Sequence, residues 1–388
     1  MPWRGVLPVD LRYEFIRAYQ SGLRSMTELC DEYGISRKTG YKWTARYDAD
    51  GRAGLTDRSR RPHSMPRLTD RRVVEQLCEA RRRHPTWSAR KLIAVLRGQH
   101  PELPWPARST GCAVLRAQGL VRARRRRNRT RAPHTPLLPI TRPNEVWTTD
   151  FKGEFRTGDG QYCYPLTLRD GFSRYVLRCD ALMTKRTEPV QHQFARAFAE
   201  YGLPERIRSD NGAPFAGMGW TRLSRLAVWW IRLGILPERI ALGHPEQNGS
   251  HEQFHRVLKA ETTRPPAAHA AAQQRRFQRC RIEYNDERPH EALHDRPPAS
   301  CYLASPRPLP ARLPPVLYPG HFEVRRVSPI GQRSWRGRQL HLTEVLAGED
   351  VGFDEVDEGI WIVYFAAVRL ARLDERMWTL TAVPHAMH

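Results

Sequence analysis

Residues 146–153 read VWTTDFKG, a β-prone run in which the acidic Asp150 interrupts hydrophobic neighbours. Trp147 and Phe151 are side chains that a sheet usually buries, whereas a carboxylate beside them would lose hydration at a cost in free energy. Further strands are predicted at 162–168, 174–179 and 205–209, and amphipathic helices at 190–201 and 221–233. We therefore expect residues 143–300 to form an α/β core with a mixed sheet.

Two further acidic residues, Asp210 and Glu252, lie where structural acids are unusual. Asp210 stands where a predicted strand gives way to Asn-Gly, and Glu252 lies one turn into a predicted helix. A strand, a strand end and a helix can bring both to Asp150 at one edge of a sheet. Clustered carboxylates raise one another's pKa unless a cation neutralises them, and oxygen ligands favour Mg²⁺ or Mn²⁺. Each acid also has an ordinary structural explanation. Asp210 fits a turn, Glu252 fits the first turn of a helix, and Asp150 fits a strand-end cap.

Residues 1–60 predict a helix–turn–helix DNA-binding domain. Gly34 can end one helix in the left-handed conformation, and Ser36 can cap the next, which runs from 37 to about 47. The outer surface of that helix carries four basic side chains, which are Arg37, Lys38, Lys42 and Arg46. A recognition helix in the major groove requires such a surface. The alternative is a small helical bundle with a solvated basic face.

Residues 66–121 predict a second helix–turn–helix or winged-helix domain.

Two linkers separate these parts from the rest of the chain. Residues 122–142 form a basic linker, with seven arginines between 122 and 131 that include Arg124, Arg125, Arg126 and Arg127. No core can absorb such charge, whereas nearby phosphates would relieve it by counterion release. A proline-rich linker follows at 301–319. Residues 320–388 predict a small all-β domain, with strands at 322–327, 339–343, 360–365 and 378–383 separated by Gly- and Asp-rich turns.

The composition limits the class of protein. Sixty-four Lys and Arg against 41 Asp and Glu give a net charge of +23, which indicates a polyanionic partner such as nucleic acid. The seven cysteines form no CxxC pair, so we expect a reduced cytoplasmic protein without a zinc ribbon. No hydrophobic run of about 18 residues predicts a membrane span, and the N-terminus lacks a secretory signal.

Three blocks resemble the catalytic blocks of insertion-sequence transposases in the retroviral-integrase-like DDE superfamily, whose core is ribonuclease-H-like. They are residues 146–153, residues 209–215 (SDNGAPF) and residues 244–252 (HPEQNGSHE). Residues 284–293 (YNDERPHEAL) resemble the segment that follows the third acid in that group. The resemblance implies that Asp150, Asp210 and Glu252 are the three catalytic, metal-binding acids. The pattern Pro-x-x-x-Gly-x-x-Glu selects Glu252 over Glu246.

One departure from retroviral integrases is the longer spacing of 41 residues between Asp210 and Glu252. Residues 218–232 can absorb the extra length, which fits insertion-sequence enzymes with a Trp-Trp-rich insert. By resemblance, Arg256 and Lys259 contact the DNA end, and Asn248 helps to position it. The alternative is that the two bases only decorate a surface helix. His251 and His255 flank the acid without a cluster of metal ligands, which leaves them structural or close to DNA.

The resemblance implies a bacterial, nucleoid-associated DNA transposase that binds terminal inverted repeats. It implies phosphodiester hydrolysis and 3′-OH strand transfer with two Mg²⁺ or Mn²⁺ ions in each active site. Because transposition joins two ends, we expect a homo-oligomer on double-stranded DNA, at least a dimer. One alternative is a transposase-derived DNA-binding regulator without catalysis. Another is a ribonuclease-H-like nuclease for RNA–DNA hybrids, which would not need two helix–turn–helix modules.

Overall fold

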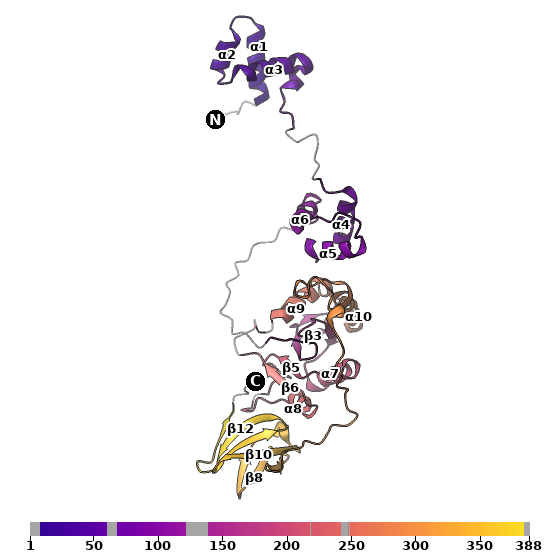
Figure 1. Cartoon of the computed structure of the whole chain (residues 1–388), viewed down its shortest axis with the longest axis vertical. Coiled ribbons are helices and arrows are strands. Elements are labelled where there is room, and N and C mark those ends of the chain that lie inside the picture. The colour runs from indigo at the N-terminus through magenta and orange to yellow at the C-terminus, as the bar shows by residue number, and fades with distance from the viewer. Residues whose placement is uncertain are drawn as a thin grey trace. The chain divides into compact units, whose positions relative to one another are not determined.

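The computed structural model describes residues 8–59, 68–121, 139–217, 219–241, 247 and 249–383 of the chain (Figure 1). Residues up to 68 form one compact unit, and residues from 69 onward form a second. Most of the predicted basic linker lies outside the described residues, together with Arg124, Arg125, Arg126 and Arg127. The same holds for Asn248 and for Glu246. The helices of the described part include none that is both long and hydrophobic enough to span a bilayer.

Three helices form the first unit, which are α1 (Pro8–Gln20), α2 (Met26–Glu32) and α3 (Arg37–Asp50). Ser36 caps α3 by accepting a hydrogen bond from the Thr39 amide, and Gly34 before it has a φ of +63°, as the predicted turn requires. The helices enclose a core that includes Phe15, Leu29 and Trp43. The predicted helix–turn–helix geometry is therefore present in this unit.

The second unit begins with another three-helix bundle, made of α4 (Arg71–Arg83), α5 (Ala89–Gln99) and α6 (Arg108–Ala117). Its core contains Leu77, Leu92, Leu115 and Trp87, and the Trp87 side chain is only 1% exposed. These helices form the helical domain predicted at 66–121.

Polar contacts join the turn between α4 and α5 to the α/β core. The Thr86 hydroxyl donates to Glu261 Oε1 at 2.6 Å, and His84 Nδ1 lies 2.9 Å from Glu283 Oε1. Arg90 donates to Asp295 Oδ2 at 3.1 Å and forms a second ion pair with Glu291 at 2.5 Å. Basic and hydroxyl groups of the bundle therefore meet four carboxylates of the core.

The α/β core is built on a sheet with strands in the order β6–β5–β1–β3, and β4 pairs with the outer side of β3. Strand β1 runs parallel to β5 and antiparallel to β3, so the sheet is mixed and β1 is central. The six strands are β1 (Val146–Phe151), β2 (Phe155–Arg156), β3 (Tyr162–Asp170), β4 (Val176–Leu182), β5 (Arg206–Ser209) and β6 (Leu236–Arg239). The predicted fold class is confirmed, although β2 and β6 were not predicted.

Successive side chains of each strand point to opposite faces of the sheet, and hydrophobic residues lie on both faces. Helices therefore cover both faces. One face packs against α7 (Thr187–Tyr201) and α8 (Arg225–Arg232) around Trp147, Phe198 and Trp230. The other face packs against α9 (Gly249–Thr262) and α10 (Ala270–Ile282) around Phe254 and Phe277. Helix α8 is shorter than the predicted 221–233, because Ser224 caps it by accepting from the Ala227 amide.

The outer edge of β4 is covered by side chains from α10 and the π-helical turn that follows it. The Gln274 amide accepts from the Ala181 N–H at 2.7 Å and donates to the Cys179 carbonyl at 3.0 Å. The Asn285 amide makes the same pair of bonds to Val176 at 2.8 and 3.0 Å. These bonds satisfy backbone groups that an exposed edge strand would leave open to a partner strand.

The C-terminal part forms an antiparallel sheet in the order β13–β12–β11–β10–β7, together with the hairpin β8–β9. Its strands are β7 (Glu323–Arg326), β8 (Gln332–Trp335), β9 (Arg338–His341), β10 (Asp350–Asp357), β11 (Ile360–Phe365), β12 (Val368–Asp374) and β13 (Thr379–Ala382). No strand was predicted at 350–357, but these residues form β10 with Val351 and Phe353 buried. Strands β8 and β12 were also missed.

Helix α8 contributes to two hydrophobic cores. Leu226 and Trp230 belong to the core of the α/β sheet, whereas Ala227 and Ile231 belong to the core of the C-terminal sheet. An ion pair of 2.7 Å between the Arg232 guanidinium and the Glu349 carboxylate adds to this junction. The C-terminal sheet is therefore packed directly on the α/β core.

Candidate active site

Asp150 lies near the carboxyl end of the central strand β1, on the face that α9 covers. Its neighbour Trp147 points into the opposite face, where it joins the core with α7. Thr148 points the same way as Asp150 and contacts His251 of α9. The Asp150 side chain is 23% exposed, so a carboxylate stands at the end of a largely buried strand and still reaches solvent.

Asp210 follows β5, the parallel neighbour of β1, as the strand ends. Its Oδ1 accepts a hydrogen bond of 3.2 Å from the Gly212 amide, which closes the turn predicted from Asp-Asn-Gly. The Asn211 amide donates to the Ile240 carbonyl at 2.9 Å and fastens this turn to the chain after β6. Since the carboxyl ends of parallel strands meet at one sheet edge, Asp210 lies beside Asp150.

Glu252 lies in the first turn of α9, and its side chain is exposed. The buried face of the same helix carries Phe254 and Leu258, which pack onto the sheet, and His251 and His255, which contact it through polar groups. Exposed and buried positions alternate as the helical period requires. The packing of α9 thus carries Glu252 to the end of β1 that bears Asp150.

The electrostatics indicate that Asp210 and Glu252 act on Asp150. The pKa of Asp150 is raised to about 7, first by burial and then by the negative charge of Asp210. A backbone hydrogen bond and the Lys152 ammonium oppose the increase, while Glu252 adds to it. The cluster therefore holds negative charge that is incompletely compensated, which is the condition under which carboxylates bind a cation.

The donor set fits a hard divalent cation, because all three candidate ligands are carboxylates. In the part of the chain that the structure describes, however, no three His, Cys, Asp or Glu side chains are close enough together to hold a metal ion. Mg²⁺ or Mn²⁺ would be held by Asp150, Asp210 and Glu252 if these side chains drew together around it. The predicted roles of the three acids remain predictions.

A buried polar network beneath Asp150 was not predicted. The Thr167 hydroxyl lies 2.6 Å from His251 Nε2 and 2.7 Å from His255 Nε2. It also donates to the backbone carbonyl of Asp150 at 2.9 Å, while His251 Nδ1 lies 2.9 Å from the Thr148 hydroxyl. The sequence signal was the i, i+4 spacing of the two histidines beside Phe254 and Leu258, which places all four on one helix face.

The predicted DNA-contact residues that the structure describes lie mostly at the surface. Arg256 and Lys259 are exposed on α9, at helical spacing from Glu252. On α3, Arg37, Lys38 and Lys42 are exposed, whereas Arg46 is half-buried. The Lys42 ammonium and the Arg46 guanidinium lie 4.4 and 5.1 Å from the centre of the Trp43 ring. Stacking on Trp43 holds these two cations near the helix surface.

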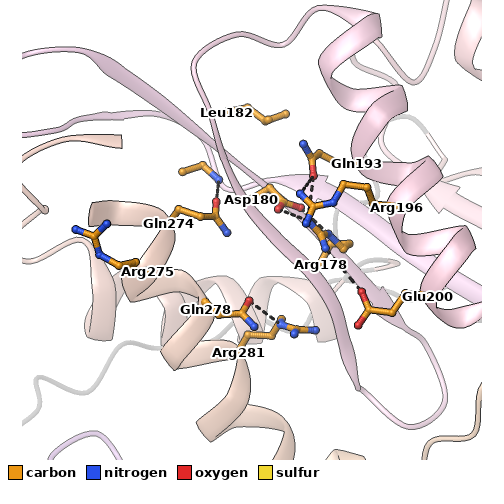
Figure 2. A pocket seen from close by; sticks show the side chains of 11 residues that line it. Arg178, Asp180, Leu182, Gln193, Arg196, Glu200, Gln274, Arg275, Gln278 and Arg281 are labelled. Atoms are coloured by element: carbon orange, nitrogen blue, oxygen red, sulfur yellow. Dashed lines mark hydrogen bonds and ion pairs between the residues drawn. The ribbon is translucent and has the colours of Figure 1, made fainter. Parts of the chain in front are cut away.

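Figure 2 shows a recess of about 540 Å³ between β4, α7 and α10, on a different part of the core from the three carboxylates. The Arg178 guanidinium bonds both oxygens of Asp180 and also the Gln193 carbonyl, at 2.7 to 3.0 Å. Gln274 meets the edge of β4 there, as described above. Because these polar groups are paired with one another, the recess is a junction between elements and gives no indication of a ligand.

Family models match most of the described chain. A helix–turn–helix domain matches residues 11–63, and a homeodomain-like domain matches residues 39–115. Two integrase core domain models match residues 140–245 and 233–298. The two integrase core matches together contain Asp150, Asp210 and Glu252.

Curated relatives match parts of the chain. An uncharacterized 31.7 kDa protein of insertion element IS407 from Burkholderia multivorans is 29% identical over 188 residues, which cover 47% of this chain and 64% of that protein. The Gag-Pol polyprotein of avian reticuloendotheliosis virus is 31% identical over 118 residues, 30% of this chain and 10% of the polyprotein. The chain thus spans less than two thirds of the length of either relative.

Solved structures of retroviral integrases give weaker likenesses. The HTLV-2 integrase catalytic core domain in complex with magnesium is 14% identical, covers 42% of this chain and 98% of that one, and has a TM-score of 0.33. The simian T-cell lymphotropic virus intasome in complex with PP2A regulatory subunit B56 gamma is 14% identical, covers 79% of this chain and 99% of that one, and has a TM-score of 0.38. At these scores the overall superposition is slight.

Proposed function

We propose that this chain, which matches integrase core and helix–turn–helix domain models and is similar to a protein of insertion element IS407, is a DNA transposase. It binds the terminal inverted repeats of its element, hydrolyses a phosphodiester bond at each end and joins the freed 3′-OH to target DNA. The observation that supports this most directly is the raised pKa of Asp150, which arises from burial and from the charges of Asp210 and Glu252. Three mutually repelling carboxylates behind DNA-reading helices suit metal-dependent phosphoryl transfer.

Asp150, Asp210 and Glu252 would hold two Mg²⁺ or Mn²⁺ ions, and bound ions would lower the pKa of the attacking water or hydroxyl and neutralise charge on the phosphate. Asp150 stands on the central strand of the sheet, so it is the central acid of the proposed set. The Lys152 ammonium acts on Asp150 and Lys259 lies near the end of α9, and both cations suit the DNA backbone. No side chain acts as a covalent nucleophile in this scheme.

The partner is double-stranded DNA, from both the element ends and the target. The basic face of α3 suits the major groove, and the net charge of +23 favours association with a polyanion at low salt. Because two ends must be joined to one target, the active form is a homo-oligomer, at least a dimer, assembled on the ends.

The test is cleavage of a labelled duplex that carries the terminal repeat found beside the gene, with the whole chain and Mg²⁺ or Mn²⁺. We expect nicking at the end and strand joining. We expect Asp150→Asn, Asp210→Asn and Glu252→Gln each to lower both reactions about a thousandfold or more. Glu246→Gln is the matched control, because the sequence pattern does not select this acid, and it should stay active.

Two results would overturn the proposal. Full cleavage by Asp150→Asn would remove the role of the carboxylates. A wild-type chain that binds the repeat tightly without nicking it would favour the alternative, a transposase-derived regulator that uses the core only for assembly.

A further inference from the structure

The buried network beneath Asp150 joins the three elements that form the candidate active site. Thr148 lies on β1, Thr167 on β3, and His251 and His255 on α9. His251 is fully buried, and His255 is 5% exposed. A buried polar group that lost its partner would cost free energy, so the four side chains strongly favour one alignment of helix on sheet.

The hydrogen atoms of this network can be counted. A threonine hydroxyl has one hydrogen and two lone pairs. The Asp150 carbonyl can only accept, so the contact of 2.9 Å uses the hydroxyl hydrogen of Thr167. Thr167 must then accept from both imidazoles, which requires a hydrogen on Nε2 of His251 and on Nε2 of His255. His251 Nδ1 lies 2.9 Å from the Thr148 hydroxyl, which can donate or accept in this contact.

The two contacts of Thr167 therefore require a hydrogen on Nε2 of each ring. Arg169 donates to the Ser250 carbonyl at 2.6 Å, beside the start of α9, and so adds a further bond between β3 and this helix.

We propose that His251 and His255 are positioning residues, which clamp α9 to β1 and β3 through the shared Thr167 hydroxyl and thereby set the placement of Glu252 relative to Asp150. The clamp acts on the placement of both Asp150 and Glu252. Thr167 fixes the backbone of Asp150 itself, and the two imidazoles fix the turn of α9 that carries Glu252. This inference rests on the proposed function, because the placement matters only if the acids share a cation.

The histidines are not themselves ligands in this proposal. Their Nε2 atoms are engaged with Thr167, and His251 Nδ1 is engaged with Thr148. Only His255 Nδ1 faces the carboxylates, at 3.6 Å from Asp150 Oδ2, and it points from a buried position. The role is the one that outer partners of metal ligands serve, whose loss typically lowers metal affinity or activity about 10- to 100-fold.

The first test does not depend on activity. Nitrogen NMR of the whole chain with labelled histidine should show a hydrogen on Nε2 of both His251 and His255, assigned by loss of each signal in His251→Gln and His255→Gln. An Nε2 without a hydrogen in either ring would overturn the proposed clamp. Removal of metal with a chelator should leave both signals unchanged.

The second test compares variants of one position. His255→Gln keeps an N–H donor near the place of Nε2, whereas His255→Leu keeps the bulk and loses the donor. We expect His255→Leu to lower kcat for end cleavage about 10- to 100-fold with little change in KM, and to speed amide exchange in α9. His255→Gln should recover most of both properties. Gln253→Leu, on the exposed face of the same helix, is the matched control and should change neither.

The two proposals fail in different ways. If the wild-type chain proves inactive on DNA while the imidazoles carry the expected hydrogens and His255→Leu loosens α9, the proposed function fails and the clamp stands. If the chain cleaves DNA and His255→Leu matches the wild type in kcat and amide exchange, the clamp is wrong and the proposed function stands. Thr167→Val and Thr167→Ser repeat the comparison from the strand side, where serine should retain the network and valine should not.

Discussion

Nδ1 of His255 lies 3.6 Å from Oδ2 of Asp150, yet the two do not form an ion pair. Burial, followed by the charges of Lys152 and Arg169, lowers the pKa of His255 to about 3, so the imidazole is neutral at physiological pH. Asp150 consequently gains no neutralising charge from His255, and its own pKa is raised to about 7. Helix α9, which carries Glu252, therefore supplies no positive charge to Asp150 through His255, and a bound cation would supply it.

The stability of the metal-free chain should depend on the ionisation of Asp150. An acid whose pKa is raised on folding stabilises the fold below its unfolded pKa, and this contribution is lost as pH rises toward the folded value. From the pKa of about 7, the loss falls between about pH 4 and pH 7. Asp150→Asn removes the ionisation, so we expect it to unfold at a higher temperature than the wild type at pH 8.

The comparison is thermal unfolding in chelator, where the gain should be of the order of 4 kcal/mol, because the pKa of Asp150 rises from 3.8 to about 7, and should shrink toward pH 4. Added Mn²⁺ should reverse the order of stability, because only the wild type can bind it through Asp150. A variant that is no more stable than the wild type at pH 8 would mean that the carboxylate is already compensated in the free protein.

The contact between the second helical bundle and the core should be sensitive to charge. Arg90 pairs with Asp295 at 3.1 Å and with Glu291 at 2.5 Å, in a partly exposed position. Arg90→Glu places like charges together, so we expect the bundle to separate from the core and the radius of gyration from X-ray scattering to increase. Reversal of the partner in Arg90→Glu with Asp295→Arg should restore compaction.

Arg97→Glu is the control for this experiment, since Arg97 lies exposed on the same helix α5. It changes the net charge by the same amount and should leave the scattering unchanged. Because the pairs are only partly buried, salt should weaken the contact in the wild type as well. Identical scattering for Arg90→Glu and the wild type would show that Thr86 and His84 suffice to hold the bundle.

Helix α8 should couple the stability of the α/β core to that of the C-terminal sheet. Ile231 is buried in the C-terminal core, and its truncation to alanine should leave a cavity that costs about 2–4 kcal/mol in the free energy of unfolding. Arg225→Ala, at an exposed position of the same helix, should cost far less. Denaturant unfolding followed by tryptophan fluorescence measures both, and equal losses in the two variants would contradict this packing.

Lys259 should contribute a phosphate contact and no sequence preference. We expect Lys259→Ala to weaken binding to element-end and unrelated duplexes alike, and to reduce the slope of log affinity against log salt by about one. Arg275→Ala, on the exposed side of α10 in Figure 2, should leave the slope unchanged. A specific loss for the end sequence alone would instead assign Lys259 to base recognition.

The fold class could be predicted because its main signals are local. Strand β1 shows itself through Trp147 and Phe151, and the turn at Asp210 through Asn-Gly. Strand β10 could not be predicted in the same way, because Asp350 and Asp354 bracket its buried centre and suggest a turn. Cross-strand pairing accommodates an acid in this strand, since Asp350 lies opposite Arg326 in the sheet and forms an ion pair of 3.5 Å with it.

The features that join distant parts of the chain were out of reach for the same reason. Arg90 and Asp295 are 205 residues apart, and Thr167 is 84 residues from His251. The i, i+4 spacing of His251 and His255 indicates a shared helix face, but it does not identify Thr167 as their partner. Their role follows only from the register that places Thr167 opposite Asp150.

The two-sided packing of α8 also bears on how such proteins diversify. Leu226 and Trp230 pack in the α/β core, whereas Ala227 and Ile231 pack in the core of the C-terminal sheet. The C-terminal sheet is therefore not an independent domain that can be exchanged alone. A chimaera joined at the proline-rich linker, residues 301–319, would expose the hydrophobic side chains of α8 that pack on the C-terminal sheet. Such an exposed hydrophobic surface would favour aggregation. Productive crossovers should instead fall upstream of α8, so that the helix is inherited together with the sheet it supports.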